Sequence, residues 1–160
     1  MTPCPYLVAR IMTVMDGAFD PVFGEAWNRR QVSDALTLPS SHSIVIDANG
    51  DEIAGEPLSP DPREPCGFVL TRHAGDEEEL LLIAVLPKNR ARGLGQILID
   101  RLLKNARDRG TKRMFLEMRR GNPAIHLYQK IGFEPIGERP KYYRLSDGTQ
   151  VDAITFGVTL

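Results

Sequence analysis

Residues 85–96 read VLPKNRARGLGQ, and they join a continuous apolar run to an amphipathic segment. The run before them, Glu79–Leu86, is rich in leucine and predicts a strand that is buried on both faces. The segment after them carries apolar residues at helical spacing from Leu94 and predicts a helix that ends at Gly110. This strand–turn–helix unit predicts a mixed α/β domain with a central sheet.

The turn itself is typical of an anion site. The first amides of a helix have no internal partner and carry partial positive charge, so a phosphate or pyrophosphate is a natural occupant. Gly93 and Gly95 let such a ligand approach the backbone, and Lys88, Arg90 and Arg92 add positive charge. The spacing fits neither the dinucleotide fingerprint nor a Walker loop. An ordinary turn with solvated basic residues is the alternative, but the flanking strand and helix favour the anion site.

The remaining pattern predicts, in order, two helices, three strands, a helix, a strand, a helix and two strands. Asn28 is a plausible cap for the second helix, and Gly132 ends the last one. Residues 48–65 contain four prolines and two glycines and predict a surface excursion. The predicted helices cover residues 7–19, 28–38, 94–109 and 123–130; the predicted strands cover 43–47, 66–72, 79–86, 113–118, a stretch from 133 that includes 142–145, and 151–158.

The composition predicts one cytoplasmic domain over residues 1–160. Two cysteines, Cys4 and Cys66, form no disulfide framework and suit a reducing compartment. The longest apolar run has seven residues, too few to span a membrane, and Arg10 interrupts the N-terminal apolar stretch, which argues against a signal peptide. We expect no metal, because the histidines are scattered along the chain at residues 42, 73 and 126.

The net charge of −1 hides two segments of opposite sign. Residues 47–79 hold ten acidic and two basic side chains, whereas residues 88–120 hold three acidic and eleven basic ones. The basic segment surrounds the proposed anion turn. We hypothesise that the acidic segment attracts a cationic amine or a basic protein N-terminus.

Several short motifs follow the turn in order. Together with Arg90, Gly93 and Gly95, they resemble the GNAT superfamily of acyl-CoA-dependent N-acetyltransferases, whose pyrophosphate motif is Gln/Arg-x-x-Gly-x-Gly/Ala. They are most similar to its ribosomal-protein alanine N-acetyltransferase (RimI-type) branch. The resemblance covers residues 67–160, and upstream only Ala26-Trp27 is similar to the family's aromatic loop. The chain is one residue shorter than the family pattern before Tyr128. The motifs are Leu116–Arg119, Asn122, Ala124–Phe133, Tyr142-Tyr143, Asp147-Gly148 and Asp152–Ile154.

This resemblance implies a single GNAT-like domain with a mostly antiparallel mixed sheet, about four flanking helices and a splayed cofactor cleft after the Glu79–Leu86 strand. It also implies acetyl-CoA as co-substrate and direct attack by the amine, without an acyl-enzyme. The Val85 amide is the preferred donor to the thioester oxygen. The implied cofactor-binding residues are Ile83, Ala84, Val85, Arg90, Ala91, Arg92, Gly93, Leu94, Gly95, Gln96 and Asn122.

Glu117 and Tyr128 are the candidate catalytic residues. Glu117 lies between Leu116 and Met118 in a predicted strand, so it faces away from both and can serve as the base if its face lines a cleft. The alternative is a surface carboxylate paired with a neighbouring arginine, and the resemblance favours the base. Tyr128 is the candidate acid for the departing thiolate, a role compatible with packing its helix on the sheet.

The other site residues have structural alternatives. Asn122 would hold the reacting end of the cofactor, or it would cap the helix that begins at Pro123. Trp27, Tyr142 and Tyr143 would line the acceptor groove, or they would pack in the core or on the surface.

We therefore predict acetyl transfer to an amine, with the N-terminal alanine of a ribosomal protein as the leading acceptor. The alternatives are a small amine, an antibiotic or a lysine side chain as acceptor, a protein that only senses acetyl-CoA, and an RNA- or ribosome-binding module. We rank direct nucleic-acid binding low because RNA-recognition motifs are absent from the sequence. We expect no membrane partner and a monomer or weak dimer.

Overall fold

The helices and strands follow one another in the predicted order. The computed structural model describes residues 4–20, 23, 25–53 and 62–160. The order of elements matches the prediction at every step. In chain order they are α1 (Pro5–Ala18), α2 (Arg29–Leu36), β1 (Ser41–Ile46), β2 (Gly67–Ala74), β3 (Glu77–Val85), a 3₁₀ turn (Pro87–Asn89), α3 (Leu94–Asp108), β4 (Arg113–Arg119), α4 (Ile125–Ile131), β5 (Glu134–Arg144) and β6 (Gln150–Thr159).

Local signals set several of these boundaries. The Asn28 side chain accepts a hydrogen bond from the Gln31 amide and the Gln31 side chain accepts one from the Asn28 amide, so α2 begins with a capping box. Gly110 and Gly132 follow α3 and α4 with φ of 88° and 112°, a left-handed conformation that stops a helix. These residues confirm the predicted starts and stops.

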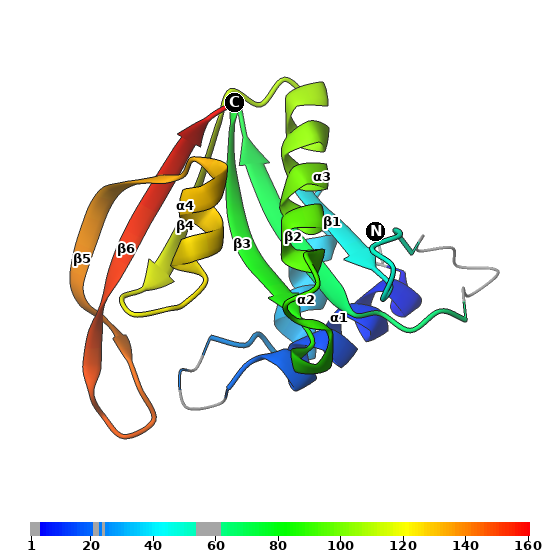
Figure 1. Cartoon of the computed structure of the whole chain (residues 1–160), viewed down its shortest axis with the longest axis horizontal. Helices are drawn as coiled ribbons and strands as arrows, with labels where there is room; N and C mark the ends of the chain where they lie inside the picture. Colours follow the sequence, from blue (N-terminus) through cyan, green and yellow to red (C-terminus); the bar gives the residue numbers. More distant parts are fainter. Residues whose placement is uncertain (1–3, 21–22, 24, 54–61) are drawn as a thin grey trace.

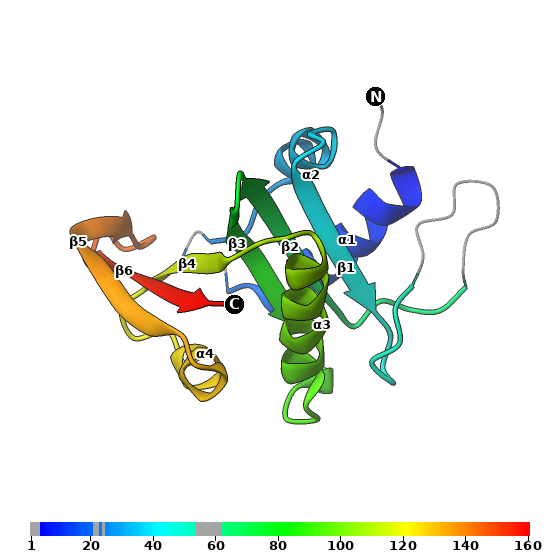
Figure 2. The same ribbon diagram turned by 90° about the horizontal axis from the view of Figure 1, so that it is seen from above.

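The six strands form one sheet in the order β1-β2-β3-β4-β6-β5. Only the β3–β4 pair is parallel, which confirms the expected mostly antiparallel mixed sheet. Helices α1 and α2 cover one face, and α3 and α4 cover the other (Figure 2). Each face has its own apolar cluster, and the leucine-rich run of β3 contributes to both clusters because Leu80 joins the α3 side and Leu82 joins the α1 side.

The sheet opens between β3 and β4. These strands pair only from Glu77–Leu80 to Arg113–Leu116. Beyond that point no strand pair of the described chain joins residues 81–85 to residues 117–119, and Figure 1 shows the two strands diverging away from the C-terminus. Leu81 has no counterpart on β2, which marks a β-bulge where the divergence starts. The expected splay of the two strands is therefore present, and we call the space between residues 81–85 and 117–119 the β3–β4 gap.

A buried charged cluster lies at the closed end of this gap. The Glu78 carboxylate is fully buried and accepts hydrogen bonds from Arg109 Nη2, at 2.8 and 2.7 Å to its two oxygens. The hydroxyls of Thr71 and Thr111 also donate to it, at 2.7 and 3.3 Å. These four contacts satisfy a charge that would otherwise be costly to bury. The cluster ties β2, β3 and the end of α3 together, and we call it the Glu78 cluster.

Two further expectations concern membrane-spanning helices and the predicted surface excursion. No helix within the described part of the chain is long and apolar enough to cross a membrane. Part of the predicted excursion, residues 54–61, lies outside the described residues. Its described edge is held by Arg63, whose Nη1 lies 3.1 Å from the Asp47 carboxylate.

Candidate functional site

The turn from β3 into α3 leaves helix amides available. Gly93 is the N-cap of α3 with φ of 78°, and no described side chain caps this end of the helix. Residues 90–93 are exposed, so the amides of the first helical turn can meet a ligand from solvent. This arrangement has the geometry that an anion site requires.

The two glycines of the turn have different neighbours. A Cβ at Gly93 would meet no atom within 4 Å, so this glycine is needed for its left-handed backbone. A Cβ at Gly95 would lie 3.2 Å from Leu127 Cδ2, so Gly95 lets α3 and α4 approach closely. The predicted role of both glycines, space for a ligand, therefore fits Gly93 better than Gly95.

The Arg90 guanidinium bonds protein carbonyls, whereas the sequence predicts that it faces a bound anion. Its Nε donates to the Val85 carbonyl at 3.0 Å, and its Nη2 donates to the Ala18 carbonyl at 2.9 Å. The guanidinium therefore joins the end of β3 to the end of α1, because two carbonyls at strand and helix ends offer it fixed acceptors. Its guanidinium donates to these two carbonyls rather than to the turn, although Arg90 is exposed like Lys88 and Arg92.

The end of β3 turns backbone groups toward the gap. The Leu86 amide donates to the Cys66 carbonyl on the β2 side at 2.8 Å. Backbone groups of successive strand residues point to opposite edges, so the amides of Val85 and Ile83 face the β3–β4 gap. Nearby in the 3₁₀ turn, Asn89 is buried and its Oδ1 has no partner among the described residues. An extended ligand with amide groups fits such an edge.

Glu117 is the first residue of β4 beyond the last β3–β4 pair. Leu116 and Met118 belong to the α3-side core, and Glu117 faces the opposite side, as strand alternation predicts. Its Oε2 accepts a hydrogen bond from Thr155 Oγ1 at 3.4 Å and lies 3.5 Å from Arg139 Nε. No described residue makes a hydrogen bond to Oε1, and the side chain is 20% exposed.

The segment between α1 and α2 brings a second carboxylate to this face. Glu25 Oε1 lies 3.1 Å from Arg119 Nε, and these side chains are 19% and 12% exposed. The Arg119 guanidinium also lies over the Phe23 ring, 3.5 Å from its centre. Sequence reasoning missed Glu25, because no local pattern connects it to an arginine 94 positions away.

The tyrosines of β5 complete this face. Burial, then Glu117 and Glu25, raise the pKa of Tyr143 to about 12, so both carboxylates lie close to its phenol. Tyr142 packs edge-on against Tyr143 and is 52% exposed. Trp27 instead packs against the apolar cluster of α1 and α2. The structure thus places Tyr143 near Glu117 and Tyr142, and it places Trp27 in a packing role, which is its structural alternative.

Tyr128 and Asn122 lie on the α3 side. Tyr128 is buried in the core against Phe133, and burial followed by Glu25 raises its pKa well above its usual value. Asn122 Oδ1 accepts a hydrogen bond from the Ala124 amide at 2.9 Å, which supports the capping alternative for that oxygen. The helix begins at Ile125 rather than at Pro123, because residues 122–125 form a tight turn instead.

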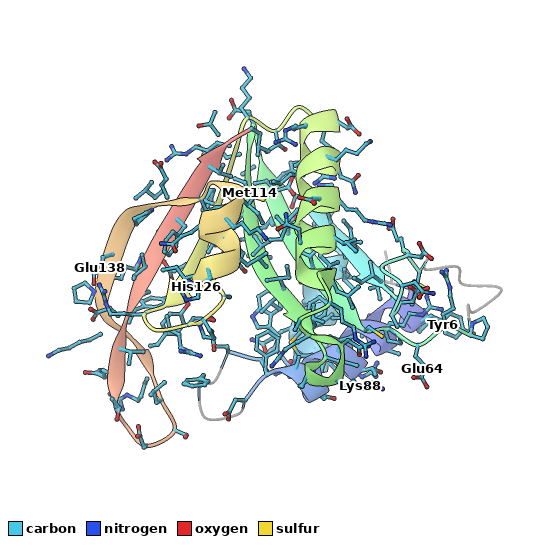
Figure 3. The ribbon with its side chains drawn as sticks, viewed as in Figure 1. Tyr6, Glu64, Lys88, Met114, His126 and Glu138 are labelled. Carbon is cyan, nitrogen blue, oxygen red and sulfur yellow. The ribbon has the colours of Figure 1, made fainter. Side chains whose placement is uncertain are left out.

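Two sets of groups flank the β3–β4 gap. In Figure 3, His126 lies on the α4 side of the gap, Lys88 lies beyond the end of β3, and Met114 lies where the two strands pair. Helix amides and a strand edge line the approach along β3. Carboxylates and tyrosines line the approach from the α1–α2 side. Such a site can hold an extended anionic ligand in the gap and present an amine to Glu117 from the opposite face.

Comparisons with known proteins agree with this arrangement. Residues 10–133 match the model of the Acetyltransferase (GNAT) family. The ribosomal protein bS18-alanine N-acetyltransferase of Salmonella typhimurium is 32% identical over 136 residues, which cover 84% of this chain and 89% of that one. The protein of the same name from Haemophilus influenzae is 33% identical over 94 residues, 59% of this chain and 64% of that relative, less than two thirds of its length.

Solved structures show the same fold. The ribosomal-protein-S18-alanine N-acetyltransferase from Escherichia coli has a TM-score of 0.77 at 23% sequence identity, over 99% of this chain and 91% of that one. The protein Ard1 from Thermoplasma volcanium has a TM-score of 0.72 at 23% identity, over 96% of this chain and 93% of that one. The six-stranded sheet and its two layers of helices are therefore common to these proteins.

Proposed function

The chain belongs to the GNAT acetyltransferase family, and from that premise we propose that it transfers the acetyl group of acetyl-CoA to the N-terminal α-amine of a protein. The observation that carries this proposal is Glu117, a carboxylate with one uncommitted oxygen at the mouth of the β3–β4 gap. The leading acceptor is the N-terminal alanine of ribosomal protein bS18, because two relatives more than 30% identical carry that activity in their names.

The residues of the gap fit acetyl-CoA. The backbone of residues 90–96 binds the pyrophosphate at the start of α3. The backbone of residues 83–85 pairs with the amides of the pantetheine arm. Asn89 Oδ1 and the Asn122 side-chain NH₂ are further polar groups near this path. Bound acetyl-CoA supplies the activated acetyl group, and the chain supplies position, proton acceptors and hydrogen-bond donors.

Three groups of the chain act on the reaction. Glu117 accepts a proton from the acceptor ammonium, which frees the lone pair for attack on the thioester carbon. The Val85 amide donates a hydrogen bond to the thioester oxygen as charge develops there. The new N–C bond forms as the C–S bond breaks, the attacking nitrogen releases its second proton to water, and the sulfur leaves toward the α4 side, where Tyr128 lies.

The depth of Tyr128 changes its proposed role. A phenol whose pKa is raised above about 10 does not pass its proton fully to a thiolate whose thiol has a pKa of about 8.5. Tyr128 therefore stabilises the leaving sulfur as a hydrogen-bond donor, and the sulfur takes its final proton from water. This refines the sequence-based hypothesis of Tyr128 as a full acid.

Replacing Tyr128 by phenylalanine should lower turnover by about 10- to 100-fold, since a hydrogen bond to a charged group contributes about 1.5–3 kcal/mol. The loss should be the same across neutral pH, because the raised pKa keeps the phenol protonated. Steady-state rates with acetyl-CoA and a peptide beginning with alanine measure it. Tyr6→Phe, on the exposed side of α1, is the matched control and should keep full turnover. A Tyr128→Phe rate equal to the control would exclude this role.

Gly93→Ala tests the turn. We expect it to raise the acetyl-CoA Kd by about tenfold, equivalent to about 1.4 kcal/mol, because alanine disfavours the φ of 78° that orients the first amides of α3. Gly110→Ala is the matched control. Gly110 also has a positive φ, of 88°, and a Cβ added there would meet no atom within 4 Å, but this glycine follows the opposite end of α3. Both variants should lose similar stability, and calorimetric titration should show weaker binding only for Gly93→Ala.

Acceptor identity is tested with ribosomal proteins that lack acetylation. We expect incubation with acetyl-CoA and this protein to add one acetyl group to the N-terminal residue of bS18, detected by peptide mass spectrometry. A bS18 variant with N-terminal proline is the control and should remain unmodified. Acetylation of lysine side chains, or of polyamines or aminoglycosides offered in parallel, would reassign the acceptor. Acetyl-CoA binding without transfer to any acceptor would contradict the enzyme proposal.

A further inference from the structure

A hollow lies at the far end of α3 from the anion turn. It has a volume of about 280 Å³ and lies between the last turns of α3 and the edge strand β1. It is lined by polar side chains and by three buried apolar residues, Ile44, Val69 and Leu102. The lining residues are Ser41, His42, Ser43, Ile44, Val69, Leu102, Asn105 and Arg109.

The rim offers hydrogen-bond donors and no carboxylate. Arg109 donates hydrogen bonds to Glu78 through Nη2, and no described residue accepts a hydrogen bond from its Nε or Nη1. The Asn105 side-chain amide also has no hydrogen-bond partner in the described chain, whereas the Ser43 side chain lies on the α1 face of the sheet, opposite to Ile44. Glu78 does not line the hollow, because it is fully buried behind Arg109 and accepts four hydrogen bonds.

His42 adds a donor that depends on protonation. Its Nε2 lies 2.7 Å from His73 Nδ1, and the two rings stack with centres 4.9 Å apart. When protonated, His42 can donate to a neutral His73 through Nε2 and still donate through Nδ1, which no described residue engages. The described residues offer no third ligand that would make this pair a metal site.

We propose that this hollow binds a small carboxylate with a short apolar tail. Arg109 and His42 hold the carboxylate, Asn105 contributes a neutral donor, and the tail fills the rest of the hollow. A guanidinium matches the planar, two-oxygen geometry of a carboxylate. The volume exceeds that of a bare ion, which is why an organic acid fits better than an inorganic anion.

Binding should be linked to proton uptake. Burial and then Arg109 lower the pKa of His42, with His73 acting in the same direction and Glu78 opposing them. A bound carboxylate adds negative charge beside the imidazole and raises that pKa. The complex therefore holds more protons than the free protein, and affinity must fall as pH rises.

The experiment is an NMR titration of the full chain with butyrate, monitored by backbone amide resonances. Butyrate should shift the Ser43 and Asn105 resonances saturably, whereas butanol and butylammonium at equal concentration should not. The affinity should fall about tenfold from about pH 5.5 to about pH 7.5, within the limit of tenfold per pH unit for one linked proton. Phosphate should bind more weakly, since it fills less of the hollow.

His42→Gln should abolish the pH dependence, and His126→Gln, an exposed histidine on α4, should preserve it. Equal shifts with butanol would overturn the proposal, as would an affinity that is constant with pH. Shifts confined to Gly93 and Gly95 would also overturn it, because they would place the anion at the α3 turn. The pH series on the unmodified protein decides the question even if His42→Gln does not fold.

Discussion

Glu117→Gln should lower turnover by about 10²- to 10³-fold, within the range that one general base contributes. The amide has nearly the same shape as the carboxylate and can still accept from Thr155, but it cannot take a proton from an ammonium at neutral pH. In the proposed complex acetyl-CoA is held by backbone groups of β3 and α3, so its Kd should change little. Single-turnover rates and calorimetric binding, measured on the same sample, separate the two effects.

Glu134→Gln is a matched control for this variant. Glu134 is an exposed carboxylate at the start of β5, on a strand that also carries Arg139. Its removal changes the net charge equally and should leave turnover unchanged. If Glu117→Gln kept the turnover of this control, Glu117 would not be the base, and Glu25 would become the carboxylate to test next.

Arg109→Met should lower the free energy of unfolding by about 3–5 kcal/mol, because it leaves the fully buried Glu78 without its cation. Thr71 and Thr111 continue to donate hydrogen bonds, yet they carry no charge to balance the carboxylate. Urea denaturation at neutral pH measures the change. This is the largest stability effect that we expect from a single side chain outside the apolar clusters.

Two further variants isolate the cause. Arg107→Met makes the same substitution on an exposed residue in the last turn of α3 and should cost less than about 0.5 kcal/mol. Glu78→Met combined with Arg109→Met removes both charges and should regain part of the loss, since paired apolar replacements of buried ion pairs are tolerated. A loss below about 1 kcal/mol for Arg109→Met alone would show that water or another group satisfies Glu78.

The order of helices and strands could be predicted because its signals are local. The Asn28–Gln31 capping box, the left-handed glycines after α3 and α4, and the leucine run of β3 each involve residues close together in sequence. The orientation of Glu117 could be predicted for the same reason, since alternation along a strand depends only on its two neighbours. The β3–β4 divergence required the family resemblance, because a bulge such as Leu81 has no clear signal in the sequence.

The side-chain partners of the site could not be predicted. Arg119 meets Glu25 across 94 positions, and Glu117 meets Thr155 across 38, so their pairing depends on the final packing of loop and hairpin. The sequence predicts Arg90 as an anion ligand because it lies in the basic turn and matches the first position of the pyrophosphate motif, and only the fold shows two carbonyls within its reach. The depth of Tyr128, which limits it to donating a hydrogen bond, likewise depends on how α4 packs.

The divergence of β3 and β4 also affects solubility. Unpaired strand edges usually invite a strand of another molecule and seed aggregation. Here the unpaired stretch of β3 lies inside the sheet, with β2 on its far side and β4 closing the gap at one end. A strand from another molecule can add only at an exposed edge of a sheet, and β3 is not an edge strand. The unpaired backbone groups of β3 can therefore serve the proposed ligand without offering an edge to which another copy of the chain can add a strand.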